Sequence, residues 1–118
     1  AVEDIVTGPG KTSLASGEFV VDFLFATPPP RTADAYLRFI PRTEMDIAVV
    51  GAGVCLTLDA SGLCTAARVG LGAVAPRPLL VPAAAAALVG TKVDDAALAS
   101  LATAASAACN PIDDKRGT

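Results

Sequence analysis

The stretch from Ile47 to Leu71 constrains the fold most strongly, because it predicts a β-hairpin. In its first half, Ile47–Asp59, apolar side chains occupy the even positions and smaller or more polar ones occupy most odd positions, the period-two pattern of a strand. The sequence Asp-Ala-Ser-Gly then signals a tight turn. Folding about this turn aligns two apolar faces and sets these pairs opposite one another: Leu58 with Leu63, Leu56 with Thr65, Val54 with Ala67, Ala52 with Val69, and Val50 with Leu71.

Two shorter stretches before this hairpin also alternate. The first, Glu18–Ala26, runs up to three consecutive prolines, which cannot donate hydrogen bonds to a sheet. The second, Ala35–Ile40, ends at Pro41. We expect both as strands, with these faces: Phe19, Val21, Phe23 and Phe25 against Val20, Asp22 and Leu24 in the first, and Leu37 and Phe39 against Tyr36, Arg38 and Ile40 in the second.

Helical signals follow the strands. Pro82 suits the first turn of a helix through Val89 with Gly90 as its cap, and Asp94 suits the N-cap of a second helix that ends near Ala108. The second helix carries an apolar stripe at three- and four-residue spacing, which favours packing onto a sheet. The residues of this stripe are Leu98, Leu101, Ala105 and Ala108.

We therefore expect a single α+β domain over residues 1–118, in which a largely antiparallel three- to four-stranded sheet has its C-terminal helices packed on one face. The other face leaves room for a second surface to approach, although simple exposure to solvent is the alternative. The side chains expected there are Val20, Arg38, Gly51, Gly53, Cys55 and Arg68.

Composition excludes several classes of function. The chain has no histidine, so it lacks the imidazole used as base or metal ligand in the commonest hydrolase and zinc sites. Its net charge is −3 and its basic residues are scattered, which argues against nucleic acid as a partner. The longest apolar runs are too short for a membrane span. Three cysteines without a paired motif predict free thiols and a cytoplasmic protein.

The segment Gly10-Lys11-Thr12 resembles the end of a phosphate-binding loop. Such a loop needs a glycine five residues before Gly10, where this chain has Ile5, and it must lead into a helix. Here the chain leads toward a predicted strand instead. We interpret this segment as a turn with an exposed Lys11.

Four sequence blocks occur in the order found in one known family. They are GPGKTSLASGEFV, AYLRFIPRTEMDIAVVGAGVCLTLD, ARVGLGAVAPRPLLVPAAAAALVG and NPIDDKRGT. Together they resemble the C-terminal domain of the FAD-binding (medium) subunit of molybdenum hydroxylases, the group that includes carbon monoxide dehydrogenase and xanthine dehydrogenase. The second and fourth blocks are the most specific.

The resemblance implies an electron-transfer role. Substrate is hydroxylated at a molybdopterin centre in another subunit, electrons cross iron–sulfur clusters, and FAD passes them to an acceptor. Most FAD contacts come from a preceding N-terminal FAD-binding domain, which we expect to be missing here, together with a final helix. The implied partners are that domain and the molybdopterin and iron–sulfur subunits, and alone the chain is expected to bind FAD weakly and to catalyse nothing.

Two flavin contacts carry over from the family by position. A family lysine falls on Arg38, and a family leucine falls on Val20. Arginine keeps the positive charge but not the lysine geometry. Thr43 and Asp46 are candidates for holding the loop near the flavin through local hydrogen bonds. The alternative hypothesis is a stand-alone interaction or dimerisation module without cofactor, which would use the small-residue face of the sheet.

Overall fold

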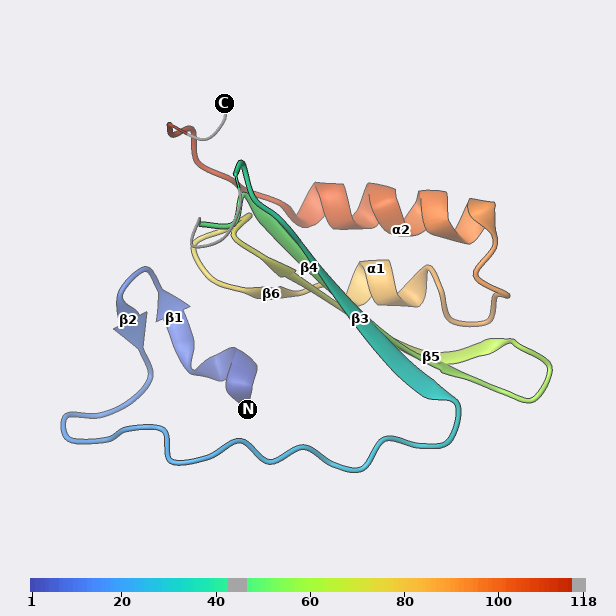
Figure 1. Ribbon diagram of the computed structural model, residues 1–118, viewed down its shortest axis with the longest axis horizontal. Coiled ribbons are helices and arrows are strands. Elements are labelled where there is room, and N and C mark those ends of the chain that lie inside the picture. Colours follow the sequence, from blue (N-terminus) through green and yellow to red (C-terminus); the bar gives the residue numbers. More distant parts are fainter. Residues whose placement is uncertain (43–46, 116–118) are drawn as a thin grey trace.

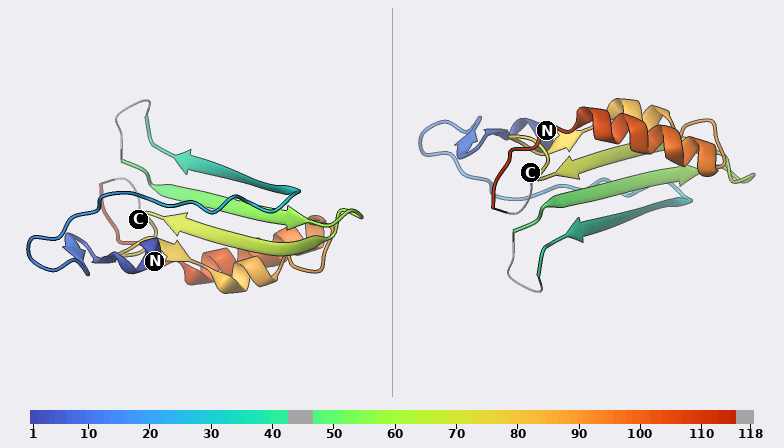
Figure 2. Two further views of the ribbon diagram at one scale, coloured as in Figure 1. Left: turned by 90° about the horizontal axis from the view of Figure 1, so that it is seen from below. Right: turned by 90° about the horizontal axis from the view of Figure 1, so that it is seen from above.

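A four-stranded antiparallel sheet with helices on one face forms the main body of the computed structural model, which describes residues 1–42 and 47–115 (Figure 1). Its strands lie side by side in chain order: β3 Thr32–Phe39, β4 Val50–Leu58, β5 Cys64–Gly72 and β6 Leu79–Leu80. The helices α1 Pro82–Ala86 and α2 Asp95–Ala108 form the second layer (Figure 2). The expected α+β fold with C-terminal helices on one face of the sheet is confirmed.

The N-terminal part is a small separate unit. It contains a short 3-10 helix, η1 Val2–Asp4, and the hairpin of β1 Val6–Gly8 with β2 Lys11–Thr12. Gly10 turns this hairpin with a φ of +66°, a conformation that favours glycine. Because the segment is a hairpin turn and Lys11 is exposed, the interpretation as a turn rather than a phosphate loop is confirmed.

The predicted strand over Glu18–Ala26 is wrong for this chain. Residues 13–31, which we call the strap, run from β2 to β3 without joining either sheet (Figure 1). Alternating side chains suit a strand, but a strand also needs a neighbour for its backbone N–H and C=O groups. Within the described residues no strand pairs with Glu18–Ala26, so the apolar side chains of this stretch stay exposed. The exposed fractions reach 81% at Val21, 98% at Leu24 and 86% at Phe25.

The central hairpin forms, but its register differs from the prediction by two residues. Val54 pairs with Val69 instead of Ala67, and Ala52 pairs with Leu71. One residue of the shift arises at the turn, because Leu58 pairs with Cys64 instead of Leu63. The second arises at the irregularity between Thr57 and Leu58, where one extra residue enters β5. Because side chains alternate with period two, a shift of two keeps both apolar faces aligned.

Asp59 shapes the turn of this hairpin. Its Oδ1 accepts hydrogen bonds from the Ser61 N–H and Oγ at 2.8 Å each and from the Leu63 N–H at 2.9 Å. These bonds, the one from the Ser61 side chain foremost, lower the pKa of the Asp59 carboxyl. Asp59 therefore holds a longer loop than the tight turn that the sequence predicted.

The core lies between the even-numbered face of β4, β5 and the helices. It forms two adjoining clusters of buried side chains, Val69, Leu71, Val74, Val81 and Ala84 in one and Cys64, Leu88 and Ala97 in the other. Cys64 is fully buried on the helix side, while Cys55 lies on the opposite face and pairs with Arg68. The three thiols are free, as predicted.

The two helices follow their predicted signals with small differences. α1 begins at Pro82 but ends at Ala86, before the predicted Val89. The Asp94 side chain caps α2 by accepting from the Ala97 N–H at 2.9 Å. Leu98 is 44% exposed, so its assignment to the packed stripe is wrong. The side chains of α2 that face the core are Ala97, Leu101, Ala104, Ala105 and Ala108.

The sequence predicted that no apolar run is long enough for a membrane span. Among the described residues, no helix is both long and apolar enough to cross a membrane.

We predict that Leu88→Ala lowers the free energy of unfolding by about 2–5 kcal/mol, because Leu88 is 1% exposed and its loss leaves a cavity beside Cys64 and Ala97 in the core. The matched control Leu98→Ala should cost roughly 1 kcal/mol or less, since that side chain is partly in solvent already. Urea unfolding of both variants measures the difference. Equal losses would contradict this description of the core.

Candidate functional site

The sheet face opposite the helices, which we call the open face, is rich in glycine. Four glycines form two directly paired positions on neighbouring strands, Gly51 with Gly72 and Gly53 with Gly70. Glycine in a strand interior weakens the strand and often marks close approach of a ligand or another backbone. This surface therefore presents backbone without Cβ atoms, as expected for Gly51 and Gly53 from the sequence.

Tyr36 covers part of this glycine surface. A Cβ atom on Gly51 would overlap the Tyr36 hydroxyl, and it would lie 3.1 Å from the ring carbon Cζ. A Cβ on Gly53 would lie at 3.6 Å from ring atom Cδ2 of the same tyrosine. The ring therefore rests on Gly51 while remaining 65% exposed on its other side.

Tyr36 was not among the predicted site residues. The signal for it was present, because Tyr36 and Arg38 share one face of an alternating stretch. The sequence pattern did not reveal that the Tyr36 ring lies beside Arg38 and over backbone without Cβ atoms.

Positive charge lies at two positions on this face. Arg68 on β5 is 3.9 Å from the Glu3 carboxylate of the N-terminal helix, so it is partly neutralised. Arg38 on β3 pairs across the sheet with Gly51, is exposed, and has no ion pair within the described residues. Arg38 therefore supplies an available positive charge beside the glycine surface.

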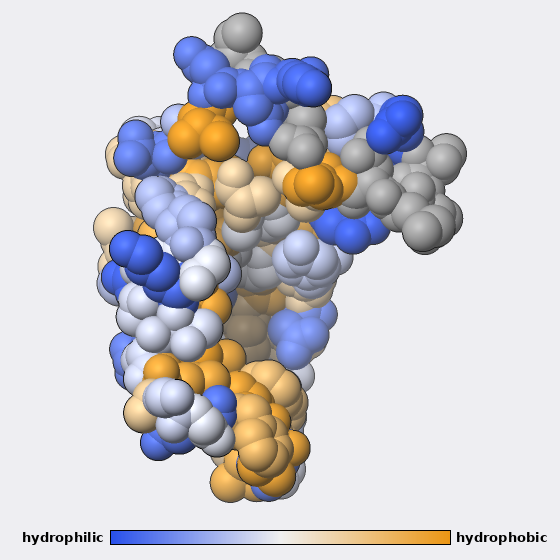
Figure 3. Space-filling model, turned by 90° about the vertical axis from the view of Figure 1, so that its left-hand side faces the viewer, coloured by the Kyte–Doolittle hydropathy of each residue, from blue (hydrophilic) through white to orange (hydrophobic). Residues whose placement is uncertain are grey.

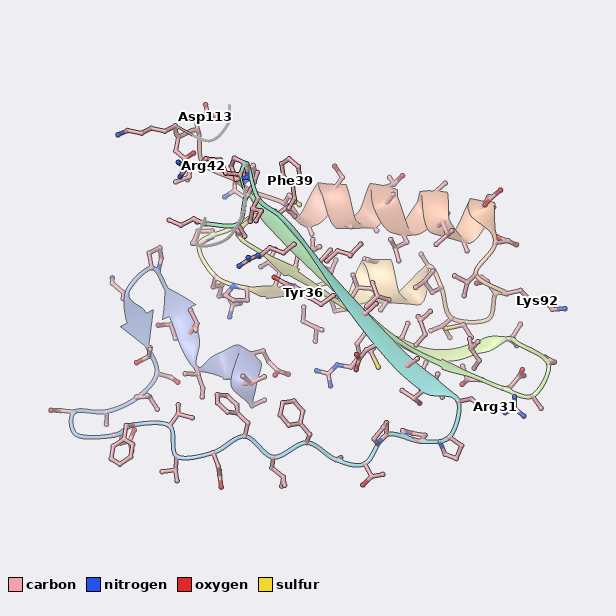
Figure 4. All side chains as sticks on the ribbon, in the orientation of Figure 1. Arg31, Tyr36, Phe39, Arg42, Lys92 and Asp113 are labelled. Atoms are coloured by element: carbon pink, nitrogen blue, oxygen red, sulfur yellow. The ribbon has the colours of Figure 1, made fainter. Side chains whose placement is uncertain are left out.

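A hollow separates the sheet from the N-terminal part, as Figure 3 shows between the left and right sides of that view. The strap closes it below, and its side chains point alternately toward and away from the sheet (Figure 4). A cavity of about 360 Å³ lies between η1 and the strap, with Val20 and Phe23 in its lining. A second of about 270 Å³ lies between Val2 and β6. Both are lined mainly by apolar side chains.

The structure separates the two predicted flavin contacts. Arg38 lies on the open face of the sheet, as predicted. Val20 lies on the strap, outside the sheet and 40% exposed, so it does not share the sheet face that carries Arg38. Thr43 and Asp46 lie outside the described residues. Residues 1–42 and 47–115 contain no cluster of three or more potential metal ligands.

Comparison with known protein families matches residues 35–118 to the CO dehydrogenase flavoprotein C-terminal domain. The chain belongs to this family. The match begins inside β3 and includes the sheet, both helices and the C-terminal segment, whereas the strap and the N-terminal hairpin precede it. The family resemblance in the sequence is thereby confirmed.

Curated relatives agree with this assignment. The chain is 36% identical over 74 residues to the putative xanthine dehydrogenase FAD-binding subunit XdhB of Escherichia coli strain K12, and 35% identical to the xanthine dehydrogenase FAD-binding subunit of E. coli O157:H7. Each alignment covers 62% of this chain but 25% of the relative. The chain thus spans only a part of the relatives it matches.

Solved structures match almost the whole chain. Reconstituted CO dehydrogenase from Oligotropha carboxidovorans superimposes with a TM-score of 0.89 at 33% identity, covering 98% of this chain and 40% of that one. CO dehydrogenase from Hydrogenophaga pseudoflava gives 0.84 at 32% identity, with 98% and 39% covered. Quinoline 2-oxidoreductase from Pseudomonas putida 86 gives 0.80 at 29%, with the same coverage. The strap is therefore included in these superpositions.

We predict that Gly51→Ala displaces the Tyr36 ring, since the added methyl group would occupy its place. Tyr36 is the only tyrosine and the chain has no tryptophan, so near-ultraviolet circular dichroism and acrylamide quenching of tyrosine fluorescence report on this ring. The matched control is Gly72→Ala, whose Cβ would meet nothing within 4 Å. A Tyr36 signal unchanged in Gly51→Ala would refute the contact.

Proposed function

We propose that this chain is the portion of a molybdenum hydroxylase flavoprotein subunit that closes over FAD, through which electrons from iron–sulfur clusters reach an acceptor. The observation that carries the proposal is the glycine-rich open face of the sheet, which also carries Arg38. The curated relatives of the chain are FAD-binding subunits. FAD supplies hydride and one-electron transfer when bound.

The residues of the open face suit a flavin in shape and charge. Paired glycines leave a surface without Cβ atoms, against which a planar ring fits closely. The Tyr36 ring adds a flat aromatic surface that favours offset stacking. A cation near a flavin stabilises the negative charge that reduction adds, which is the contribution proposed for Arg38.

We also propose that the remainder of the flavoprotein subunit packs against the strap and the hollow. Apolar side chains on both sides of the strap are exposed in this chain, a pattern that marks surfaces covered by other protein. The superposed CO dehydrogenase chain is longer, since this chain covers 40% of it, and the superposition includes 98% of this chain. The expected N-terminal FAD-binding domain is therefore the proposed occupant of the hollow, with Val20 facing the cofactor from the strap.

The other expected partners belong to the same proposal. The molybdopterin and iron–sulfur subunits would deliver electrons to the flavin, in the cytoplasm, and this chain alone would catalyse no reaction. The alternative of a cofactor-free interaction module has less support, because the matched family is a flavoprotein domain and both curated relatives are FAD-binding subunits.

We predict that Arg38→Gln, made in the intact flavoprotein subunit, lowers the two-electron reduction potential of bound FAD by on the order of 30 mV, which corresponds to about 1.4 kcal/mol. Losing the cation destabilises the reduced, negatively charged flavin. Arg38→Lys should restore most of the potential. Spectroelectrochemical titration measures it, with Arg77→Gln in the β5–β6 loop as the charge-matched control. Identical potentials for Arg38→Gln and the native subunit would contradict the role of Arg38.

A further inference from the structure

The outer edge of β3 offers unpaired backbone groups. β3 is the terminal strand of the sheet, and no strand lies beyond it in the described chain (Figure 2). The Leu58 N–H donates to the Arg31 C=O at 3.0 Å, so the odd-numbered residues direct their backbone groups toward β4. The Thr32 and Thr57 hydroxyls meet at 2.8 Å, as expected for a pair that does not exchange backbone bonds. The even-numbered residues Asp34, Tyr36 and Arg38 therefore direct their N–H and C=O groups outward.

This edge lacks several of the devices that protect edge strands against pairing. Within Thr32–Phe39 there is no proline, no lysine and no bulge, and seven of the eight residues are exposed. Proteins commonly block long edge strands by one of these devices, because an open edge is a template for another strand. Leu37 at 78% and Phe39 at 62% exposure add apolar surface on the helix side of the same strand.

The sequence of the edge is complementary to itself in the antiparallel direction. When two copies pair about Tyr36, Asp34 of each lies opposite Arg38 of the other. On the opposite face, small residues meet large ones: Ala33 faces Phe39, and Ala35 faces Leu37. The central Tyr36 pair exchanges backbone hydrogen bonds, which agrees with its outward N–H and C=O groups.

Neighbouring registers lose this match. Centring the pair on Asp34 or on Arg38 places like charges directly opposite one another, which is unfavourable. Centring on Ala35 or Leu37 brings residues to the centre whose backbone groups already point toward β4. A twofold interface requires one surface patch to complement itself, and only the register about Tyr36 satisfies charge, volume and hydrogen bonding together.

We propose that the β3 edge is a self-association surface, through which two copies of this chain join their sheets antiparallel about Tyr36. The twofold axis runs perpendicular to the sheet, so the helices of both copies lie on one side and both glycine faces on the other. The proposal goes beyond the proposed flavin role and does not depend on it. Arg38 has five N–H donors, so an ion pair with Asp34 of the other copy leaves further donors available for the proposed flavin contact.

Charge reversal at the edge tests the proposal. Sedimentation velocity of the native 118-residue chain over a concentration series should show a monomer–dimer equilibrium. Asp34→Arg and Arg38→Asp should each raise the dissociation constant at least about tenfold, because each places two like-charge pairs in the interface. The double variant Asp34→Arg/Arg38→Asp restores opposite pairs and should recover the dimer. An equimolar mixture of the two single variants should form the heterodimer.

The control is Asp113→Arg, which makes the same charge change in the C-terminal segment and should leave the equilibrium unchanged. Circular dichroism melting of each variant verifies the fold. A native chain that stays monomeric at several hundred times the concentration used for the fold measurements overturns the proposal. A native dimer that both single reversals leave intact, or a double variant that fails to recover while folded, overturns it equally. FAD binding and reduction potential are separate readouts, so failure here leaves the flavin role to its own test.

Discussion

The pairing of β4 with both neighbours is the interaction on which the rest of the structure depends. β4 shares backbone hydrogen bonds with β3 on one side and β5 on the other. Its even residues enter the core under the helices, while its glycines line the open face. β3 is exposed on both faces, and β4 is its only neighbouring strand in the described residues, so Arg38 and Tyr36 owe their positions to β4. One strand thus couples the stability of the core to the geometry of the candidate flavin surface.

Local periodicity allowed much of this arrangement to be predicted. The alternation in β4 and β5 gave the correct faces, and Asp94 gave the start of α2. The exact register depended on hydrogen bonds of the Asp59 side chain and on a bulge, which periodicity does not contain. For Leu98, the three- and four-residue spacing predicted the helix correctly but did not predict which side of the helix packs against the sheet. Such details arise from tertiary packing.

The strap shows a different limit. Its alternation predicts a strand, but whether a strand forms depends on a partner, and none pairs with residues 18–26 in the part of the chain that the structure describes. The Arg38 position was predicted on the correct face because β3 pairs within the chain, whereas Val20 was misplaced in the sheet because the strap does not. Tyr36 was overlooked because its importance comes from the paired glycines beneath it, which become neighbours only in the folded sheet.

The central claim is that the strap and the open face are covered by the remainder of a flavoprotein subunit. Hydrogen–deuterium exchange of the strap tests it most directly, by comparing this chain alone with the proposed intact subunit. The account predicts fast exchange over residues 18–26 in the isolated chain, at least about a hundredfold slower exchange in the intact subunit, and unchanged exchange in α2. Equally fast exchange of the strap in both would contradict the account.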